Sequence, residues 1–130
     1  MSLAKVWNFT IEQGASFYKE LQWKRRNTQN EDWKPVDMGG YHVRCQIRYR
    51  ANSNIVVKDL HTKIINSKEG KFAIWLSNRE TATLPTTGET WQDYELMTYD
   101  IKTFAPGLRN AYRLVNGRVR VSPAVTKIDL

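Results

Sequence analysis

The chain has 130 residues, with 20 Lys and Arg against 13 Asp and Glu, so its formal charge is +7. This length fits a single domain, residues 1–130, that needs no metal or disulfide to bury a core. No apolar run approaches the roughly 20 residues of a membrane span, residues 1–13 do not read as a signal peptide, and the only cysteine, Cys45, excludes an internal disulfide. We therefore expect a protein that stays in the cytosol where it is made and has no membrane contact.

The N-terminal quarter predicts two β-strands followed by a long connection. Residues 6–11 and 17–23 are rich in aromatic and branched side chains, which favour strands, and Gly14 between them signals a turn or bulge. Residues 24–41 are polar and include the pair Gly39-Gly40. We expect this segment to cross the surface without regular structure.

A clean period-two pattern follows the connection. Val43, Cys45, Ile47 and Tyr49 alternate with polar or charged residues, which predicts an antiparallel strand with one face in water. The short apolar runs at 55–57 and 63–65 predict a small edge pair, or a strand and its return.

The next segment predicts a strand and then a helical turn. In residues 71–76, Phe72, Ile74 and Leu76 share one face, which we expect to be buried. Ser77 and Glu80 have the spacing of a capping box, in which the serine hydroxyl and the glutamate carboxylate each bond the other residue's backbone amide. One short helical turn should end before Pro85.

The last third predicts a hairpin. Tyr94 and Leu96 are expected on the core face of a strand, opposite Asp93 and Glu95. A turn at 105–107 would pair residues 96–102 with 111–122. Asn116-Gly117 could form a second turn, but we favour a glycine bulge within one long final strand.

About seven or eight strands with one short helical turn predict an all-β, two-sheet antiparallel β-sandwich. Alternation also predicts which apolar side chains form its core. These are Trp23, Val43, Ile47, Phe72, Ile74, Leu76, Tyr94, Leu96 and Val119.

The residues of catalytic type do not form a convincing set. Cys45 is in phase with the core positions and His42 is on the opposite face, so we do not expect them to act as a dyad, and His61 is expected at the surface. Asp93 and Glu95 could share a strand face, which we interpret as a solvated or contact face rather than an acid-base pair. We predict no catalytic residue, no cofactor and no metal site.

Exposed arginines and tryptophans are the candidate contact residues. Arg44, Arg48 and Arg50 form a basic strand face, which could bind nucleic-acid bases stacked on nearby aromatic rings. Arginine with tryptophan is also typical of protein interfaces. We therefore favour protein contact or a solvated face over nucleic-acid binding. Arg118 and Arg120 on the last strand have the same two interpretations, protein contact or nucleic-acid binding. The predicted interface residues are Trp33, Arg44, Arg48, Arg50, Trp75, Trp91, Arg118 and Arg120.

Five spaced motifs carry a family resemblance. The motifs span residues 11–17, 40–48, 76–85, 93–96 and 117–123. In order and spacing they resemble small virion structural proteins of tailed bacteriophages and prophages, with a fold similar to the immunoglobulin-like N-terminal domain of phage upper baseplate proteins. Residues 24–39 and 86–92 depart from the pattern of that group.

The resemblance implies a non-enzymatic immunoglobulin-like sandwich that is assembled into a virion in the host cytoplasm. Its expected place is the tail, the baseplate or a fibre attachment point, and its expected partners are other virion proteins and copies of itself in a symmetric assembly. Alternatives are a capsid decoration or head-tail connector protein, a nucleic-acid-binding module that uses the basic face, and a carbohydrate-binding module that uses Trp75 and Trp91.

Overall fold

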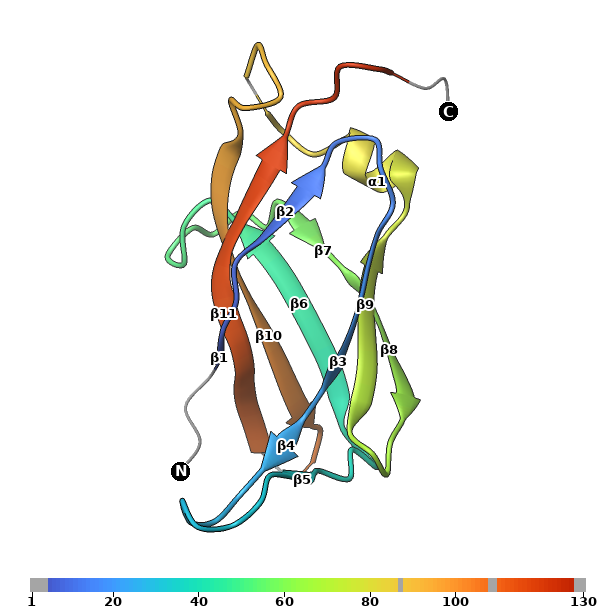
Figure 1. Cartoon of the computed structure of the whole chain (residues 1–130), viewed down its shortest axis with the longest axis vertical. Coiled ribbons are helices and arrows are strands. Elements are labelled where there is room, and N and C mark those ends of the chain that lie inside the picture. The colour runs from blue at the N-terminus through green and yellow to red at the C-terminus, as the bar shows by residue number, and fades with distance from the viewer. Residues whose placement is uncertain (1–4, 87, 108–109, 128–130) are drawn as a thin grey trace.

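The chain folds as an all-β sandwich, as predicted (Figure 1). The computed structural model describes residues 5–86, 88–107 and 110–127. A six-stranded sheet packs against a three-stranded sheet, and a two-stranded ribbon lies at one end. The described residues form eleven strands rather than seven or eight, because four of the strands have only two residues.

The six-stranded sheet is built around its two longest strands, β10 (Glu95–Ala105) and β11 (Asn110–Ser122). They form the predicted antiparallel hairpin, with Gly107 at a positive φ of 87° beside Pro106. Residues 108–109, in the same connection, lie outside the described part of the chain. On the far side of β10, β6 (His42–Arg48) pairs antiparallel with β10 and β7 (Lys58–Asp59) pairs with β6.

The N-terminal segment covers part of the outer edge of β11. The predicted strand at 6–11 is interrupted: β1 (Lys5–Val6) and β2 (Phe9–Glu12) each pair in parallel with β11. Between them, the Asn8 side chain accepts a hydrogen bond from the Arg118 amide at 2.8 Å. Gly117 lies against the Trp7 carbonyl so closely that a Cβ would collide with it.

The irregularity in β11 lies at Leu114 and not at Gly117, so the predicted glycine bulge is misplaced. Ile101 pairs with Val115 and Lys102 with Arg113, which leaves Leu114 as an extra residue. Gly117 keeps a regular register, and the close approach of the Trp7 carbonyl is the physical reason for a residue without a side chain there.

The three-stranded sheet has the order β3-β9-β8, with bounds β3 (Phe17–Gln22), β9 (Lys71–Leu76) and β8 (His61–Asn66). The prediction that 55–57 pairs with 63–65 is wrong, because β8 pairs with β9 and residues 55–57 precede β7. After β9 comes α1 (Asn78–Ala82), which begins with the predicted capping box of Ser77 and Glu80.

The connection at 24–41 is more ordered than predicted. It contains the ribbon of β4 (Lys24–Arg25) and β5 (Lys34–Pro35). Backbone hydrogen bonds from the Trp23 amide to Gly70 and from the Val36 amide to Trp23 tie the ribbon to the sandwich. Met38 is fully buried, which no local pattern in this polar segment indicates.

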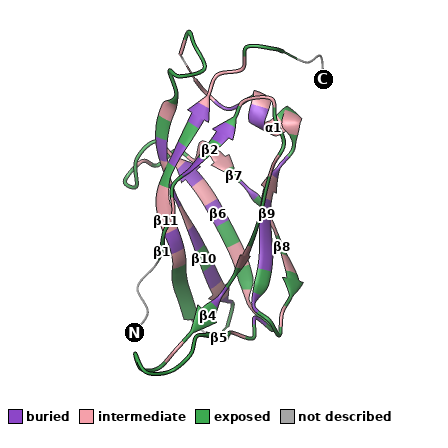
Figure 2. Ribbon diagram, in the orientation of Figure 1, coloured by how far each residue is buried: buried purple, intermediate pink, exposed green. Residues whose placement is uncertain are grey.

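The core lies between the two sheets (Figure 2). Most of the predicted core residues are buried, and Val43 packs against the core while half-buried. Two predictions are wrong: Tyr94 is 47% exposed and Leu96 is 39% exposed. The residues of β10 that face the core are those of the opposite phase, Met97, Tyr99, Ile101, Thr103 and Ala105.

The phase of β10 can be tested with two neighbouring substitutions. Met97→Ala removes a side chain that is 1% exposed and should lower the free energy of unfolding by about 2 to 5 kcal/mol. Leu96→Ala removes an exposed side chain and should cost about 1 kcal/mol or less. Urea denaturation measures both changes. Equal costs for the two variants would contradict this phase.

Candidate interaction surfaces

The outer face of the six-stranded sheet gathers four of the predicted interface arginines. Thr98 on β10 pairs with Arg48 on β6 and with Arg118 on β11, so these three residues form one row across the sheet. Arg120 lies two residues further along β11, and Arg44 lies two rows away opposite Lys102. Side chains that pair across antiparallel strands lie on the same face, so the register brings the predicted arginines together.

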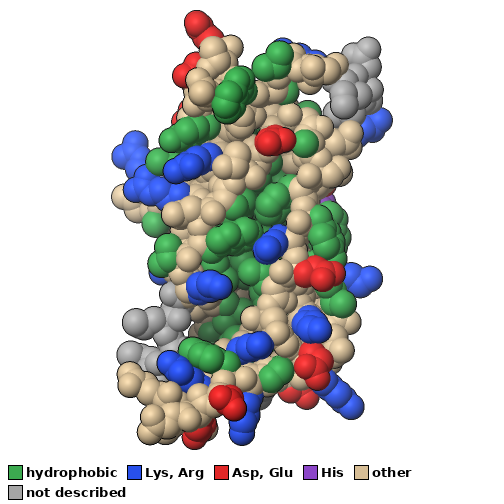
Figure 3. Space-filling model, viewed as in Figure 1, with side chains coloured by type: hydrophobic (Ala, Val, Ile, Leu, Met, Phe, Trp, Pro, Cys, Tyr) green, Lys and Arg blue, Asp and Glu red, His purple; other side chains and the backbone are tan. Residues whose placement is uncertain are grey.

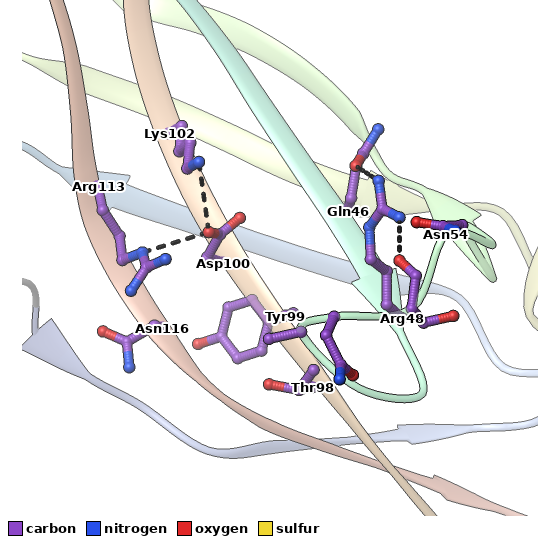
Figure 4. A pocket seen from close by; sticks show the side chains of 12 residues that line it. Gln46, Arg48, Asn54, Thr98, Tyr99, Asp100, Lys102, Arg113 and Asn116 are labelled. Carbon is purple, nitrogen blue, oxygen red and sulfur yellow. Dashed lines mark hydrogen bonds and ion pairs between the residues drawn. The ribbon is translucent and has the colours of Figure 1, made fainter.

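Asp100 lies in the middle of this basic face, beside a depression of about 620 Å³ (Figure 4). Its carboxylate is 3.2 Å from Arg113 Nε and 4.0 Å from Lys102 Nζ. Among the described residues, the cations of the face are Arg44, Arg48, Lys102, Arg113, Arg118 and Arg120, and its acids are Glu12, Asp59 and Asp100. Positive charge therefore dominates the face, although its centre carries an acid.

Two of these arginines are already engaged within the molecule. The Arg48 guanidinium donates to the Ser53 carbonyl at 2.6 Å and to the Gln46 side chain at 3.0 Å, which anchors the loop after β6. Arg44 Nε is 3.5 Å from Asp59 on the neighbouring strand β7. Arg50 is exposed in the loop and is not part of the strand. Arg118 and Arg120 are thus better placed for a partner than Arg48.

A second cluster lies at the β4–β5 end of the sandwich, and we call it the ribbon patch: Arg25, Arg26, Trp33 and Tyr112 (Figure 1). The Arg26 guanidinium stacks over the ring of Trp33 at 4.5 Å, and Trp33 is 49% exposed. Arg25 lies 5.6 Å from the Tyr112 ring and the same distance from the buried ring of Trp23. Sequence reasoning found Trp33 but missed its partners, because the segment had no strand periodicity.

The opposite end carries the loop patch: Trp91, Tyr94 and Arg120 (Figure 1). Trp91 is 63% exposed, and the Ser122 hydroxyl donates to its carbonyl at 2.8 Å. The Arg120 guanidinium lies 5.0 Å from the Tyr94 ring. Because Tyr112 and Arg120 are eight residues apart on β11, the two patches are separated by about 25 Å at about 3.3 Å per residue.

Trp75, the remaining predicted interface tryptophan, lies on the outer face of the three-stranded sheet. It is half-buried, and its ring stacks on that of His61 with centroids 5.5 Å apart. His61 is exposed, as expected, and its Nε2 is 2.7 Å from Glu80 Oε2. Trp75 therefore offers a partner less surface than Trp33 or Trp91.

The groups with shifted pKa values have structural explanations. Burial raises the pKa of the Cys45 thiol to about 12, and the exposed His42 lies on the opposite face of β6, as predicted. Burial also raises the pKa of Tyr99, whose hydroxyl donates to the Trp7 carbonyl. A thiol with so high a pKa stays protonated at neutral pH and is a poor nucleophile.

The predicted pairing of Asp93 with Glu95 on one strand face is wrong. Asp93 precedes β10, and its carboxylate accepts hydrogen bonds from the Thr90 amide and hydroxyl at 3.1 and 3.0 Å. Within the described ranges, no group of three or more His, Cys, Asp or Glu side chains is arranged to hold a metal ion. The same residues include no helix with the length and hydropathy to span a membrane.

No protein-family model matches this chain, and no curated protein matches it significantly. The resemblance to phage virion proteins therefore rests on the order and spacing of the sequence motifs. The structural evidence on function lies in three surfaces: the basic outer face of the six-stranded sheet, the ribbon patch and the loop patch.

The helix cap makes folding stability depend on pH. A hydrogen bond from the Ser77 amide at 3.0 Å, helped by His61, lowers the pKa of Glu80 from 4.5 to about 2. A depressed pKa contributes stability that is present above pH 4.5 and is lost as the pH falls toward 2. The Glu80→Gln variant lacks this contribution. Its free energy of unfolding, measured by urea denaturation, should therefore approach the wild-type value as the pH falls from 4.5 toward 2. A difference that does not change with pH would contradict the capping role.

Proposed function

We propose that this protein is a non-enzymatic structural component of a tailed-phage particle. Its place would be the tail, the baseplate or a fibre attachment point, where it assembles with other virion proteins and with copies of itself. The five spaced sequence motifs support the virion assignment. The surface chemistry supports assembly through protein contacts.

The observation that carries the proposal is the stacking of arginines on exposed aromatic rings. Arg26 on Trp33 and Arg120 on Tyr94 hold large side chains in fixed positions at the surface. Trp, Tyr and Arg are the residues that dominate binding energy in protein interfaces. A side chain that is held before binding loses less conformational entropy when a partner arrives.

The positions of the two patches fit a repeated assembly. The ribbon patch and the loop patch lie at opposite ends of the sandwich, so one copy can contact a different neighbour at each end. Contacts of this head-to-tail kind close into rings when the rotation between copies permits. Repetition around a symmetric particle then turns weak contacts into a stable attachment.

The strand order supports an immunoglobulin-like arrangement as part of the same proposal. The order β6-β10-β11 in one sheet corresponds to strands C, F and G of an immunoglobulin domain. In the other sheet, β3-β9-β8 corresponds to strands B, E and D. Both correspondences follow the order of the strands along the chain.

A nucleic-acid-binding module is the second candidate, and the basic outer face of the six-stranded sheet favours it. Against it, Asp100 lies at the centre of that face, and Arg44 and Arg48 are engaged within the molecule. Binding through this face predicts an affinity that falls steeply as salt rises. It also predicts loss of binding when Arg44, Arg48 and Arg50 are replaced together.

The direct test locates the chain in purified phage particles from the source lysate by mass spectrometry and cryo-electron microscopy. Density at the tail or baseplate supports the proposal, and density on the capsid selects the decoration alternative. If the chain is absent from the particles, the proposal fails, and a salt titration of nucleic-acid binding tests the second candidate.

Tryptophan variants test which surface assembles. Trp33→Ala and Trp91→Ala each remove an exposed anchor and should lower incorporation into particles about tenfold, with little change in folding stability. Quantitative mass spectrometry of purified particles measures incorporation. The matched control is Tyr18→Ala, whose side chain is 60% exposed on the three-stranded sheet. Equal losses for all three variants, or no loss for any of them, would count against these two patches.

A further inference from the structure

An apolar groove of about 530 Å³ lies between the two sheets along one side of the sandwich. Figure 3 shows it as a hollow with hydrophobic side chains inside and Lys and Arg side chains around it. One wall is β3, an edge strand of the three-stranded sheet, and the other is the N-terminal half of β11. We call this hollow the side groove.

Part of the β11 wall of the side groove has a strand edge with which no described residue pairs. The N-terminal segment pairs with β11 at Val115–Asn116 through β1 and at Val119–Ser122 through β2. Among the described residues, the stretch 110–114 pairs with β10 on one side only. An unpaired edge presents backbone N–H and C=O groups that can accept another strand.

The floor and walls of the side groove are apolar. Phe72 and Trp23 lie at the floor, and Leu21 and Leu114 are half-buried in the walls. Leu114 is the extra residue of the bulge in β11, and a bulge redirects a side chain relative to its strand. The bulge thus places an apolar residue beside the uncovered edge.

The rim of the side groove is positively charged. Lys5, Lys19 and Lys24 line it, and within the described ranges none of them has a carboxylate at ion-pair distance. Lys19 extends from β3 toward the other sheet, where its amine lies 5.5 Å from the Trp7 ring. Glu20 is the acid of the rim and accepts a hydrogen bond from the Tyr18 hydroxyl at 2.8 Å.

From these features we propose that the side groove binds an extended segment of a partner protein with alternating apolar and acidic residues. The segment pairs with the edge of β11 at residues 110–114 and so adds a strand to the six-stranded sheet. Because side chains alternate along a strand, one set enters the apolar groove while the other reaches the rim lysines. This inference rests on the proposed function and defines the partner chemistry of one docking surface.

A peptide array tests the inference with purified full-length protein. Seven-residue peptides carry Val or Leu at alternate positions, with Glu, Lys or Ser at the others, and fluorescence anisotropy measures their binding. The glutamate peptides should bind at least tenfold more tightly than the lysine peptides, and added salt should reduce the difference. A glutamate peptide with N-methylated amides on one edge should lose binding, because it cannot pair with β11.

Two variants localise binding to the side groove. Leu114→Glu should reduce affinity for the glutamate peptides at least tenfold. The double variant Lys19→Glu with Lys24→Glu should do the same by reversing surface charges that are not part of the core. Its matched control is Lys63→Glu with Lys68→Glu, which makes the same charge change at exposed positions outside the groove and should leave affinity unchanged.

Several results would overturn the inference. These are the absence of binding by any glutamate peptide, equal binding of lysine and glutamate peptides, undiminished binding after N-methylation, or equal effects of the two double variants. Particle incorporation separates this failure from failure of the proposed function. Wild-type chain in particles together with normal incorporation of the Lys19→Glu, Lys24→Glu variant overturns the docking surface alone, whereas absence of the wild-type chain overturns the proposed function.

Discussion

The pairing of β10 with β11 is the constraint on which the other features of this molecule depend. It joins an 11-residue strand to a 13-residue strand, and every other strand of the six-stranded sheet is attached to one of them directly or through β6. Its register places Arg118 across from Thr98 and hence in line with Arg48. The length of β11 also separates the ribbon patch from the loop patch.

The bulge at Leu114 divides β11 into two parts with different roles. Beyond it, the N-terminal segment covers the strand edge, and the Trp7 carbonyl packs against Gly117. Before it, no described residue pairs with the outer edge, which borders an apolar groove. An uncovered edge next to apolar side chains risks aggregation, and lysines around such an edge are a common protection against unspecific pairing. In the proposed docking, the same lysines would favour an acidic strand over a neutral one, so protection and selectivity would have one physical origin.

Alternation predicted the strands in which only one face is apolar. In β6, Cys45 and Ile47 are buried while Arg44 and Gln46 face outward, so the phase was readable. In β10, apolar residues occur in both phases, and Leu96 and Met97 are adjacent. Local pattern cannot decide between such neighbours, since the choice depends on which face the opposite sheet covers. That is why the strand was predicted but its inward face was wrong.

The surface clusters depend on tertiary contacts that carry no local signal. Trp33 was identified as exposed, yet its stacking partner Arg26 follows from the β4–β5 pairing, which backbone bonds from Trp23 and Val36 hold in place. The ribbon patch and the loop patch lie at the ends of the sandwich, and the basic face and the side groove lie along its sides. The surfaces meet, because Trp33 of the ribbon patch also lines the side groove and Arg120 of the loop patch also belongs to the basic face. In the proposed assembly, contacts at the ends would set the spacing between neighbours, and contacts along the side would set which partner strand is accepted. The end contacts and the side contacts are therefore adjacent on this scaffold, because β11 runs from Tyr112 of the ribbon patch, past the side groove, to Arg120 of the loop patch.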